Sequence, residues 1–334
     1  MFSGKKVLIT GGTGSLGTAL TTKLLTTDVS AIRIFSRDEW KQIQMQQALN
    51  DNRLRFFIGD VRDKERLSRA LDDVDIVIHT AALKQVPIAE YNPFEAVKTN
   101  VYGAQNLIEG CLENEVEIAL AIGTDKAVSA LNTYGATKLL MEKLFVSANF
   151  IKGNRDIKFL CVRYGNVLGS RGSLVPVLVN QIKNGKKVTI TDVDMTRFNI
   201  TMNEALELIF RTIQNGGGGE IFIPKLKAYR VGDMKEAIME LLDSRDGTEK
   251  IPIRPGEKLH ELLINKYELR NTYETNDDYV IFDKELHQEF LGSTGVINRK
   301  RADLHDEYSS DKVTLLTKKE LKEILLKENI MSTK

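Results

Sequence analysis

Cysteine and histidine are scarce in this chain: its 334 residues include two cysteines and four histidines. The two cysteines, Cys111 and Cys161, cannot form the disulfide framework of a small secreted domain. No group of cysteines and histidines has the spacing of a metal site. We therefore predict that the protein binds no metal and does not depend on thiol chemistry.

A surplus of either charge is also missing, because 47 Lys and Arg residues face 46 Asp and Glu residues and leave a formal net charge of +1. This balance argues against a protein that binds nucleic acid by neutralising phosphates and against a polybasic membrane anchor. No apolar run approaches the ~18 residues that span a bilayer, and the first run, Lys6–Thr10, begins too early for a signal peptide. We expect a cytoplasmic protein without nucleic-acid or membrane partners.

Short apolar runs alternate with longer amphipathic segments throughout the first half of the chain. Such runs, joined by helices, are typical of βαβ units whose parallel strands are buried on both faces. The sequence therefore predicts the α/β class, with a doubly wound parallel sheet of the Rossmann type. The strand-like runs are Lys6–Thr10, Ala31–Ser36, Leu54–Gly59, Asp75–Thr80, Ile118–Gly123 and Ile157–Val162, and the helical segments are Ser15–Thr27, Asp38–Asn50, Asp63–Leu71, Pro93–Asn114 and Tyr134–Lys152.

The alternation ends after Tyr164, where glycine and proline gather in residues 165–176. One later run, Glu220–Pro224, has the length and the apolar character of a last sheet strand. We therefore predict two parts. The first is a sheet domain of residues 1–165 with about 206–224, and the second is a smaller, discontinuous substrate-binding lobe of about 166–205 with 225–334.

Three glycines, Gly11, Gly14 and Gly17, follow the first predicted strand and open the first helical segment. The first permits a tight turn, the second lets the backbone approach a pyrophosphate, and the third lets helix and strand pack closely. The N-terminus of the helix offers free N–H groups and the positive end of its dipole to phosphates. The position of these glycines in a βαβ series predicts a dinucleotide site, in which we include Thr13, Ser15 and Leu16.

The end of the second predicted strand indicates which dinucleotide is bound. NAD-selective sites place an acidic residue there to accept from the ribose 2′-hydroxyl. Here the strand ends in Ser36 and Arg37, a hydroxyl and a fixed cation that suit a 2′-phosphate. This favours NADP. The alternative is that Arg37 is a solvated surface residue and that Asp38 caps a helix.

A tyrosine and a lysine, Tyr134 and Lys138, are four residues apart in the last helical segment and so share one face. We expect the lysine to lower the tyrosine pKa from its ordinary value near ~10 and to bind the nicotinamide ribose. The tyrosine can then take the proton of an alcohol as hydride leaves. The fifth predicted strand ends just upstream, at Gly123 and Thr124, and places this pair beside the cofactor.

These motifs resemble the extended short-chain dehydrogenase/reductase superfamily, whose members act on nucleotide sugars. Thr124-Asp125-Lys126 stands where the sugar-nucleotide 4,6-dehydratases of that superfamily carry Thr-Asp-Glu, with Asp as acid and Glu as base. A lysine in the third place resembles the inverting, 5-epimerising UDP-N-acetylglucosamine 4,6-dehydratases. Further similar segments are Phe35–Glu39, Ile58–Asp63, Ala81–Pro87, Arg163–Val167, Ser170–Ser173 and Arg254–Lys258.

The resemblance implies a reaction that regenerates its cofactor. Hydride passes from carbon 4 to NADP⁺ while Tyr134 takes the hydroxyl proton, and it later returns to carbon 6. Lys126 removes the proton on carbon 5 while Asp125 protonates the departing hydroxyl of carbon 6. Lys126 then needs a lowered pKa, which we expect from burial and from nearby Lys138, and Asp125 needs a raised one. Return of the proton to the opposite face inverts carbon 5.

The resemblance also implies the substrate, UDP-N-acetylglucosamine, and a homo-oligomer, which would be a hexamer. Three arginines are suited to the two phosphates of UDP, and Glu257 is suited to accept from a ribose hydroxyl. The predicted substrate contacts are Lys84, Asn166, Arg171, Gly172, Ser173, Thr189, Arg197, Arg254 and Glu257. The further cofactor contacts that we predict are Asp38, Lys41, Asp60, Val61, Ala81, Ala82, Lys84, Asn100 and Val167.

Two other functions stay open at this point. A UDP-sugar 4-epimerase keeps the tyrosine–lysine pair but needs no acid and base for carbon 6, so Asp125 and Lys126 argue against it. A non-catalytic NADP-sensing protein usually loses the tyrosine or the lysine, and this chain has both. We therefore predict an enzyme, a hydro-lyase with tightly bound and recycled NADP, that acts in the synthesis of surface polysaccharides.

Overall fold

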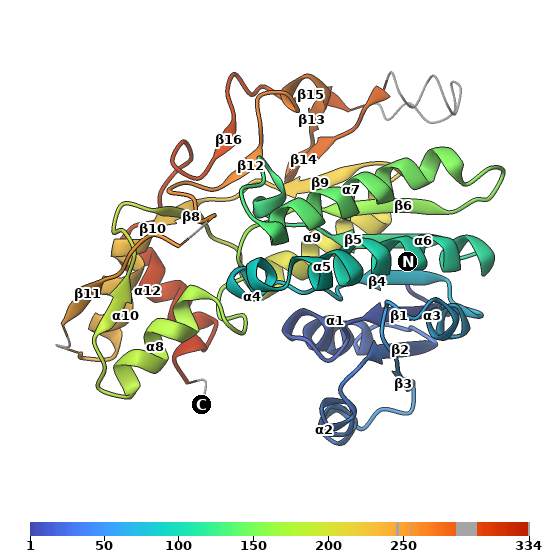
Figure 1. Cartoon of the computed structure of the whole chain (residues 1–334), viewed down its shortest axis with the longest axis horizontal. Helices are drawn as coiled ribbons and strands as arrows, with labels where there is room; N and C mark the ends of the chain where they lie inside the picture. Colours follow the sequence, from blue (N-terminus) through green and yellow to red (C-terminus); the bar gives the residue numbers. More distant parts are fainter. Residues whose placement is uncertain (245–246, 255, 285–298, 333–334) are drawn as a thin grey trace.

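A sheet of ten strands forms the centre of the larger lobe in the computed structural model, which describes residues 1–244, 247–254, 256–284 and 299–332 (Figure 1). Among these residues the strand order is β15-β13-β14-β9-β6-β5-β4-β1-β2-β3. Pro255, within the segment that resembles the dehydratases, lies outside the described residues. The predicted α/β class with a Rossmann-type sheet is confirmed.

Seven neighbouring strands of this sheet are parallel. They match the predicted runs to within a residue at each end, because strands buried on both faces consist of almost nothing but apolar residues. They are β1 (Lys6–Thr10), β2 (Ala31–Ser36), β3 (Leu54–Ile58), β4 (Ile76–His79), β5 (Ile118–Ile122), β6 (Lys158–Val162) and β9 (Ile221–Pro224).

Three short strands extend the sheet beyond β9: β14 (Asp278–Ile281), β13 (Thr272–Glu274) and β15 (Lys300–Arg301). All of them are antiparallel to their neighbours. The predicted division assigned these residues to the substrate-binding lobe, and the structure instead places them at the edge of the main sheet.

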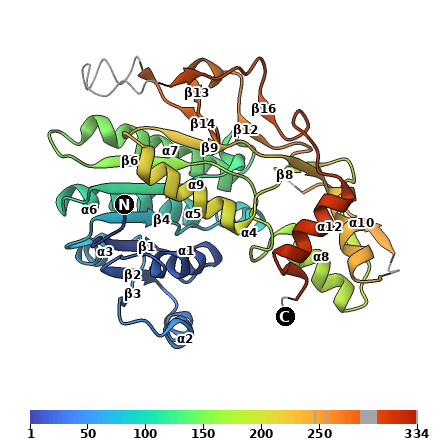
Figure 2. The ribbon, with the colours of Figure 1, turned by 180° about the vertical axis from the view of Figure 1, so that it is seen from behind.

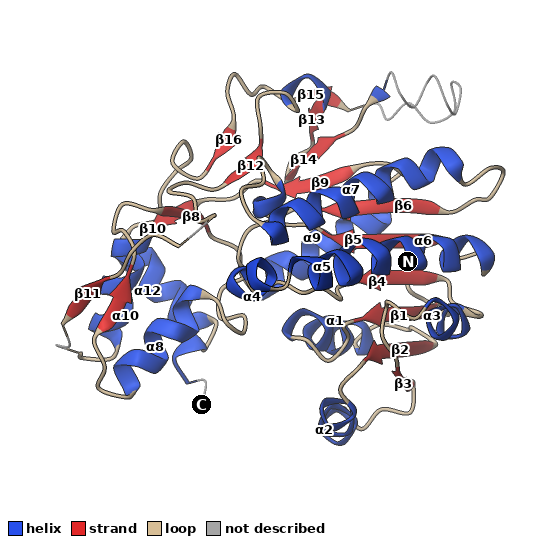
Figure 3. Ribbon diagram, viewed as in Figure 1, coloured by secondary structure: helices blue, strands red, loops and turns tan. Residues whose placement is uncertain are grey.

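Helices cover both faces of the sheet and bury two separate apolar cores against it (Figure 3). Alternate residues of each strand serve the two cores: Val7 and Ile9 of β1 point to one face and Leu8 to the other. One face is covered by α1 (Ser15–Leu25), α2 (Glu39–Leu49) and α9 (Met202–Asn215). The other is covered by α3 (Lys64–Leu71), α6 (Gly103–Glu113) and α7 (Thr133–Ile151).

The segment predicted as one helix over Pro93–Asn114 is divided in the structure. It consists of α5 (Pro93–Ala96), the π-helical turn η1 (Val97–Tyr102) and then α6. A short helix that was not predicted, α4 (Val86–Tyr91), precedes it. The wider turn of η1 carries Asn100, whose side chain is buried.

A smaller lobe lies beyond the carboxyl ends of the sheet strands and has its own apolar core (Figures 1 and 2). Its helices are α8 (Leu174–Lys183), α10 (Val231–Leu241) and α12 (Lys318–Lys327), and α12 begins with a capping box of Thr317 and Glu320. Two parallel strands, β7 (Val188–Ile190) and β11 (Thr248–Lys250), lie beside them.

Four further strands and three short helical turns complete the described elements. The strands are β8 (Thr196–Phe198), which pairs with β10 (Ala228–Arg230), and β12 (Leu262–Ile264), which pairs with β16 (Tyr308–Ser309). The turns are η2 (Asp125–Ala127), η3 (Leu269–Asn271) and η4 (Ile330–Ser332). Among the described residues, no helix has both the length and the apolar character needed to cross a membrane.

Candidate active site

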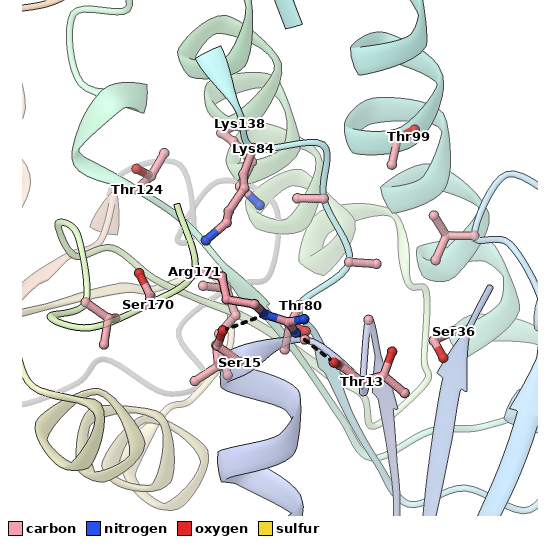
Figure 4. A pocket seen from close by; sticks show the side chains of 18 of the residues that line it. Thr13, Ser15, Ser36, Thr80, Lys84, Thr99, Thr124, Lys138, Ser170 and Arg171 are labelled. Atoms are coloured by element: carbon pink, nitrogen blue, oxygen red, sulfur yellow. Dashed lines mark hydrogen bonds between the residues drawn. The ribbon is translucent and has the colours of Figure 1, made fainter. Parts of the chain in front are cut away.

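A cavity of about 510 Å³ opens along the carboxyl ends of β1, β2, β4 and β5, where ligands of open α/β sheets bind. Figure 4 shows part of its wall, with Lys84, Lys138 and Arg171 directed into it. The predicted site residues that line it are Gly11, Thr13, Gly14, Ser15, Leu16, Ser36, Arg37, Asp38, Lys41, Asp60, Val61, Ala81, Ala82, Lys84, Thr124, Lys126, Tyr134, Lys138, Asn166, Val167 and Arg171.

The glycine loop has the close backbone approaches that its sequence predicts. A Cβ on Gly11, whose φ is +66°, would lie 2.9 Å from the backbone of Ala81, and one on Gly17 would lie 2.5 Å from that of Gly12. Gly17 therefore acts in packing and does not line the cavity. Gly14 is the N-cap of α1 and has no side chain to cap it, so the first N–H groups of the helix face the cavity. This geometry fits a dinucleotide pyrophosphate.

The end of β2 brings together the hydroxyl of Ser36 and the positive charges of Arg37 and Lys41. The side-chain amide of Gln42 donates to the carbonyl oxygen of Ser36 at 3.1 Å and to its Oγ at 3.0 Å, and so fixes this residue. Arg37 is 66% exposed, and its Nη1 lies 3.6 Å from Asp60. Asp38 caps α2 by accepting from the backbone N–H of Lys41 at 3.0 Å. Asp38 therefore both caps α2 and lines the cavity.

The tyrosine helix packs directly on the turn that carries the predicted acid and base. Asn132 caps α7 by accepting from the N–H of Gly135 at 2.8 Å. A Cβ on Gly135 would collide with the carbonyl oxygen of Lys126, so glycine is required where α7 meets η2. This contact places Thr124, Lys126 and Tyr134 around one corner of the cavity.

Lys126 and Asp125 form an ion pair in that corner. Nζ of Lys126 lies 3.1 Å from Oδ1 of Asp125 and donates to Oδ1 of Asn166 at 3.3 Å. The hydroxyl of Thr124 donates to the same Asp125 oxygen at 2.9 Å. Asp125 itself is buried behind the cavity wall, close to Gly165.

The predicted lowering of the Lys126 pKa is wrong. Burial alone would lower this pKa, but the charges of Asp125 and Glu261 outweigh burial and hold it above its ordinary value. The sequence predicts the effects of burial and of Lys138 on this pKa, but it gives no sign of Glu261, which is distant in the chain. Lys126 is therefore an ammonium.

Lys138 is buried and Tyr134 is half-buried, and burial moves their pKa values in opposite directions. Burial raises the pKa of Tyr134, against the nearby charge of Lys126 and a hydrogen bond with Thr124. Burial lowers the pKa of Lys138 to about 8, and its Nζ lies 3.0 Å from the sulfur of Met141. The cation that favours the tyrosinate here is Lys126, whereas we had expected Lys138.

Arg171 lies over the glycine loop and not at a separate phosphate site. Its Nη2 donates to the carbonyl oxygen of Thr13 at 3.0 Å and its Nε to Oγ of Ser15 at 3.3 Å (Figure 4). The next residue, Gly172, has a φ of +75°, and Ser173 donates to the carbonyl oxygen of Ser170 at 2.7 Å. Neither Gly172 nor Ser173 lines the cavity.

The remaining predicted substrate residues belong to the smaller lobe and its junction with the sheet, outside the cavity wall. Nη2 of Arg197 lies 3.6 Å from Oε1 of Glu257, and the backbone N–H of Arg254 donates to Oε2 of Glu257 at 3.2 Å. Thr189 accepts from the side chain of Gln181 at 2.7 Å. The structure therefore brings three of these residues together and leaves Thr189 apart on β7.

Asn100, predicted as a cofactor contact, supports the cavity wall from behind. Its Oδ1 accepts from the N–H of Leu83 at 2.8 Å, and its Nδ2 donates to the hydroxyl of Thr137 at 3.0 Å. It thereby ties η1 to α7 and to the segment after β4. Lys84 follows in that segment, and burial with the charges of Arg171 and Lys126 lowers its pKa.

The family model described as "Polysaccharide biosynthesis protein" matches residues 7–283. A Campylobacter jejuni protein named "UDP-N-acetylglucosamine 4,6-dehydratase (inverting)" is 47% identical over 317 residues, which cover 93% of this chain and 94% of that protein. The chain belongs to this polysaccharide biosynthesis family.

Two further proteins that are similar to this chain carry other names. A Rickettsia conorii protein named "UDP-glucose 4-epimerase" is 39% identical over 332 residues, which cover 98% of this chain and 96% of that protein. The X-ray structure of Pen from Bacillus thuringiensis is 37% identical and has a TM-score of 0.92, with 99% of each chain covered.

Part of the cavity wall consists of residues that were not predicted from the sequence. Most of the missed residues lie at the carboxyl ends of strands. The predicted α/β sheet could have indicated them, because ligands of such sheets bind at these ends. They are Phe35, Gly59, Thr80, Thr99, Ile122, Gly123, Tyr164, Gly165, Ser170 and Met202. Glu261, which lies 3.7 Å from Lys126, had no local signal, because only the tertiary structure brings them together.

Proposed function

We propose that the protein catalyses the NADP-dependent 4,6-dehydration of UDP-N-acetylglucosamine with inversion at carbon 5. The product is UDP-2-acetamido-2,6-dideoxy-beta-L-arabino-hex-4-ulose, for the synthesis of deoxy-amino sugars and surface glycans. The observation that carries this proposal is the Lys126–Asp125 pair, whose 3.1 Å contact lies in the cavity corner beside Tyr134. The 47% identity to the inverting dehydratase of Campylobacter jejuni supports it.

The cofactor, when bound, supplies the chemistry of accepting hydride from carbon 4 and returning it to carbon 6. The end of β2 favours NADP, since Ser36, Arg37 and Lys41 all line the cavity there. A hydroxyl and two cations suit a 2′-phosphate. The N-terminus of α1 would bind the pyrophosphate, and Arg171 would close over it.

One proton transfer within the Lys126–Asp125 pair generates both the base and the acid. If the ammonium proton moves to the carboxylate across the 3.1 Å contact, the amine and the carboxyl group are both neutral. Closure of the site over a substrate favours this form, because low dielectric disfavours separated charges. A raised Lys126 pKa is therefore compatible with its role as base.

A second candidate is a UDP-sugar 4-epimerase, which the 39% identity to the Rickettsia conorii protein favours. Tyr134 and Lys138 would serve both reactions. The dehydratase alone needs a base for carbon 5 and an acid for carbon 6. The position of Lys126 and Asp125 in the same corner therefore favours dehydration.

The test is incubation of the purified protein with UDP-N-acetylglucosamine in deuterium oxide, without added cofactor, followed by NMR. We expect loss of the carbon 6 hydroxyl, deuterium at carbon 5 and the inverted configuration there. A 4-epimer that keeps its carbon 6 hydroxyl would establish the epimerase instead. Bound cofactor with no turnover of this sugar or of UDP-glucose would favour the sensing protein.

We also propose that the protein is a homo-oligomer. Large apolar side chains are exposed along α4, α5 and η1: Ile88, Tyr91, Phe94 and Tyr102. Tyr91 is 88% exposed, which is costly unless a second copy covers it. Replacing Tyr91 with glutamate should reduce the assembly size in analytical ultracentrifugation. A monomeric wild-type protein would contradict the proposal.

A further inference from the structure

Glu261 is a buried carboxylate at the base of the active site, immediately before β12. The residue is 3% exposed, and its Oε1 lies 3.7 Å from Nζ of Lys126 and 3.8 Å from Nε of Arg197. Its Oε2 is buried and has no hydrogen-bond partner among the described residues. The backbone of Glu261 is fixed, since its N–H donates to Oγ of Ser310 at 2.9 Å and its carbonyl oxygen accepts from the N–H of Ser310.

Two other buried carboxylates, those of Glu142 and Glu220, have both oxygens paired. Glu142 accepts from Arg163 at 3.2 and 2.8 Å, one bond to each oxygen. Glu220 accepts from the backbone N–H groups of Gly217 and Gly218. A buried carboxylate oxygen without a partner costs free energy, which an amide or an apolar side chain in its place would avoid. A structural role alone therefore does not account for Glu261.

Removal of the proton from carbon 5 creates a positive charge on Lys126, close to the carboxylate of Glu261. The C5–H bond breaks, its proton joins Nζ of Lys126, and its electron pair forms the double bond between carbons 5 and 6. The C6–O bond breaks at the same time, and the proton of Asp125 leaves with that oxygen as water. A neutral amine thus becomes an ammonium, 3.7 Å from Oε1 of Glu261.

We propose that Glu261 is a positioning residue of Lys126, which holds the amine toward Asp125 and stabilises the ammonium that forms as carbon 5 loses its proton. This inference rests on the proposed dehydratase function. It assigns to Glu261 the task that a buried carboxylate performs for a catalytic histidine: it orients the base and stabilises its protonated form.

The charged groups around Lys126 make Glu261 the main stabilising charge for its ammonium once Asp125 is protonated. The two carboxylates that act on the Lys126 amine are Asp125 and Glu261, and Arg197 on β8 opposes them. Once Asp125 carries its proton, Glu261 is the carboxylate that still stabilises the ammonium. Arg197 is itself shared with Glu257 at 3.6 Å, so it offsets Glu261 only in part. The other titratable groups that interact with Lys126 are Lys84, Tyr134, Tyr229 and Lys258.

The test is the holoenzyme with Glu261→Gln, which keeps the side-chain shape and removes the charge. We expect kcat for UDP-N-acetylglucosamine to fall about 100-fold, a size typical of acid–base catalysis, with little change in KM. Oxidation at carbon 4 passes its proton to Tyr134, and Glu261→Gln keeps Lys126, whose charge favours the tyrosinate. Reduced nicotinamide should therefore accumulate during turnover and be visible in the near-ultraviolet absorbance. The limb of the pH–rate profile that belongs to Lys126 should move to lower pH, because the charge favouring its ammonium is gone.

Glu220→Gln is the matched control, since Glu220 is equally buried but lies at the amino end of β9, away from the cavity. It should leave kcat and the absorbance unchanged, and Glu261→Asp should recover part of the lost rate. Wild-type kcat in Glu261→Gln would overturn the inference while leaving the dehydratase in place. Equal loss of oxidation and dehydration, without reduced cofactor, would also overturn it. A wild-type protein that does not dehydrate this sugar would overturn the proposed function and the inference with it.

Discussion

The amine of Lys126 is a group that a dehydratase needs and that a 4-epimerase on the same fold does not. Replacing Lys126 with methionine keeps the length of the side chain and removes the base. We expect dehydration to fall by about 10²- to 10⁴-fold, the usual contribution of a general base. The amount of bound cofactor should be unchanged, because the contacts of Lys126 are with Asp125, Asn166 and Glu261. Product formation is measured by NMR.

The matched control for this prediction is Lys143→Met on the exposed face of α7, which is far from the cavity lining. It should dehydrate at the wild-type rate. Dehydration that survives in Lys126→Met would show that another group removes the proton on carbon 5. The proposed function would then lose the observation that carries it.

Arg37 is the residue on which the choice of NADP over NAD depends. Its guanidinium is exposed at the end of β2 and makes one contact, at 3.6 Å, with Asp60. A charge-assisted bond to a 2′-phosphate contributes about 1.5–3 kcal/mol, so Arg37→Ala should weaken NADP binding by about 10- to 150-fold and leave NAD binding nearly unchanged. Titration of cofactor-depleted protein measures both affinities, with Arg69→Ala on α3 as control. Equal weakening of NADP and NAD would contradict the assignment.

At the scale of elements, β6, α7 and the segment after β12 meet at one buried arginine. Arg163 donates to Glu142 on α7, to Glu268 at 3.1 and 3.0 Å, and to the carbonyl oxygen of Leu263 at 2.9 Å. Arg163→Met would leave Glu142 as a buried charge without its partner. Such a loss costs about 3–5 kcal/mol of unfolding free energy.

Urea denaturation measures this cost, and Arg155→Met in the exposed loop after α7 should change stability by less than about 0.5 kcal/mol. The double variant Arg163→Met with Glu142→Leu should recover part of the loss, because it removes both charges. A single variant as stable as the wild type would show that the three elements are held together by their apolar contacts alone.

The elements that the sequence predicted well are those whose residues carry the pattern locally. The parallel strands consist of apolar runs, and Gly11–Gly17 and Tyr134–Lys138 are local motifs. The break at η1 was missed, because a period of 3.6 residues fits Pro93–Asn114 as one helix and a single wider turn leaves no mark on it. The edge strands were missed because β14 forms by pairing with β9, and β13 by pairing with β14.

The residues of the candidate site fall into the same two groups, those with a local pattern and those without one. Residues that one loop or one helix supplies were placed from the sequence, and the relation between distant segments was not. The sequence suggested that Arg171 binds the substrate phosphates, whereas its contacts are with Thr13 and Ser15 of the glycine loop. Glu261 gave no signal, since its effect on Lys126 arises only where β12 packs against η2.

For the whole molecule, His79 links the buried core to the pH dependence of stability. It is fully buried at the end of β4, with Nδ1 2.8 Å from the hydroxyl of Thr10. Burial and the charge of Lys138 lower its pKa to about 3, whereas an unfolded chain has an ordinary value of about 6.5. Between these values the unfolded state binds more protons. The stability that His79 contributes is therefore complete above about pH 6.5 and is lost as the pH falls toward about 3.

Replacing His79 with glutamine removes this titration and leaves a polar side chain near Thr10. The variant should lose less unfolding free energy than the wild type between about pH 6.5 and 4. The difference should be about 1.4 kcal/mol for each pH unit over which the unfolded wild type binds the His79 proton and the folded wild type does not. Exposed carboxylates with lowered pKa values, such as Glu240, lose their contributions in both proteins and cancel in the comparison. Urea denaturation of the two proteins across this range measures the difference. Parallel curves would mean that His79 takes up its proton in the folded protein as readily as in the unfolded chain, and that the core tolerates its charge.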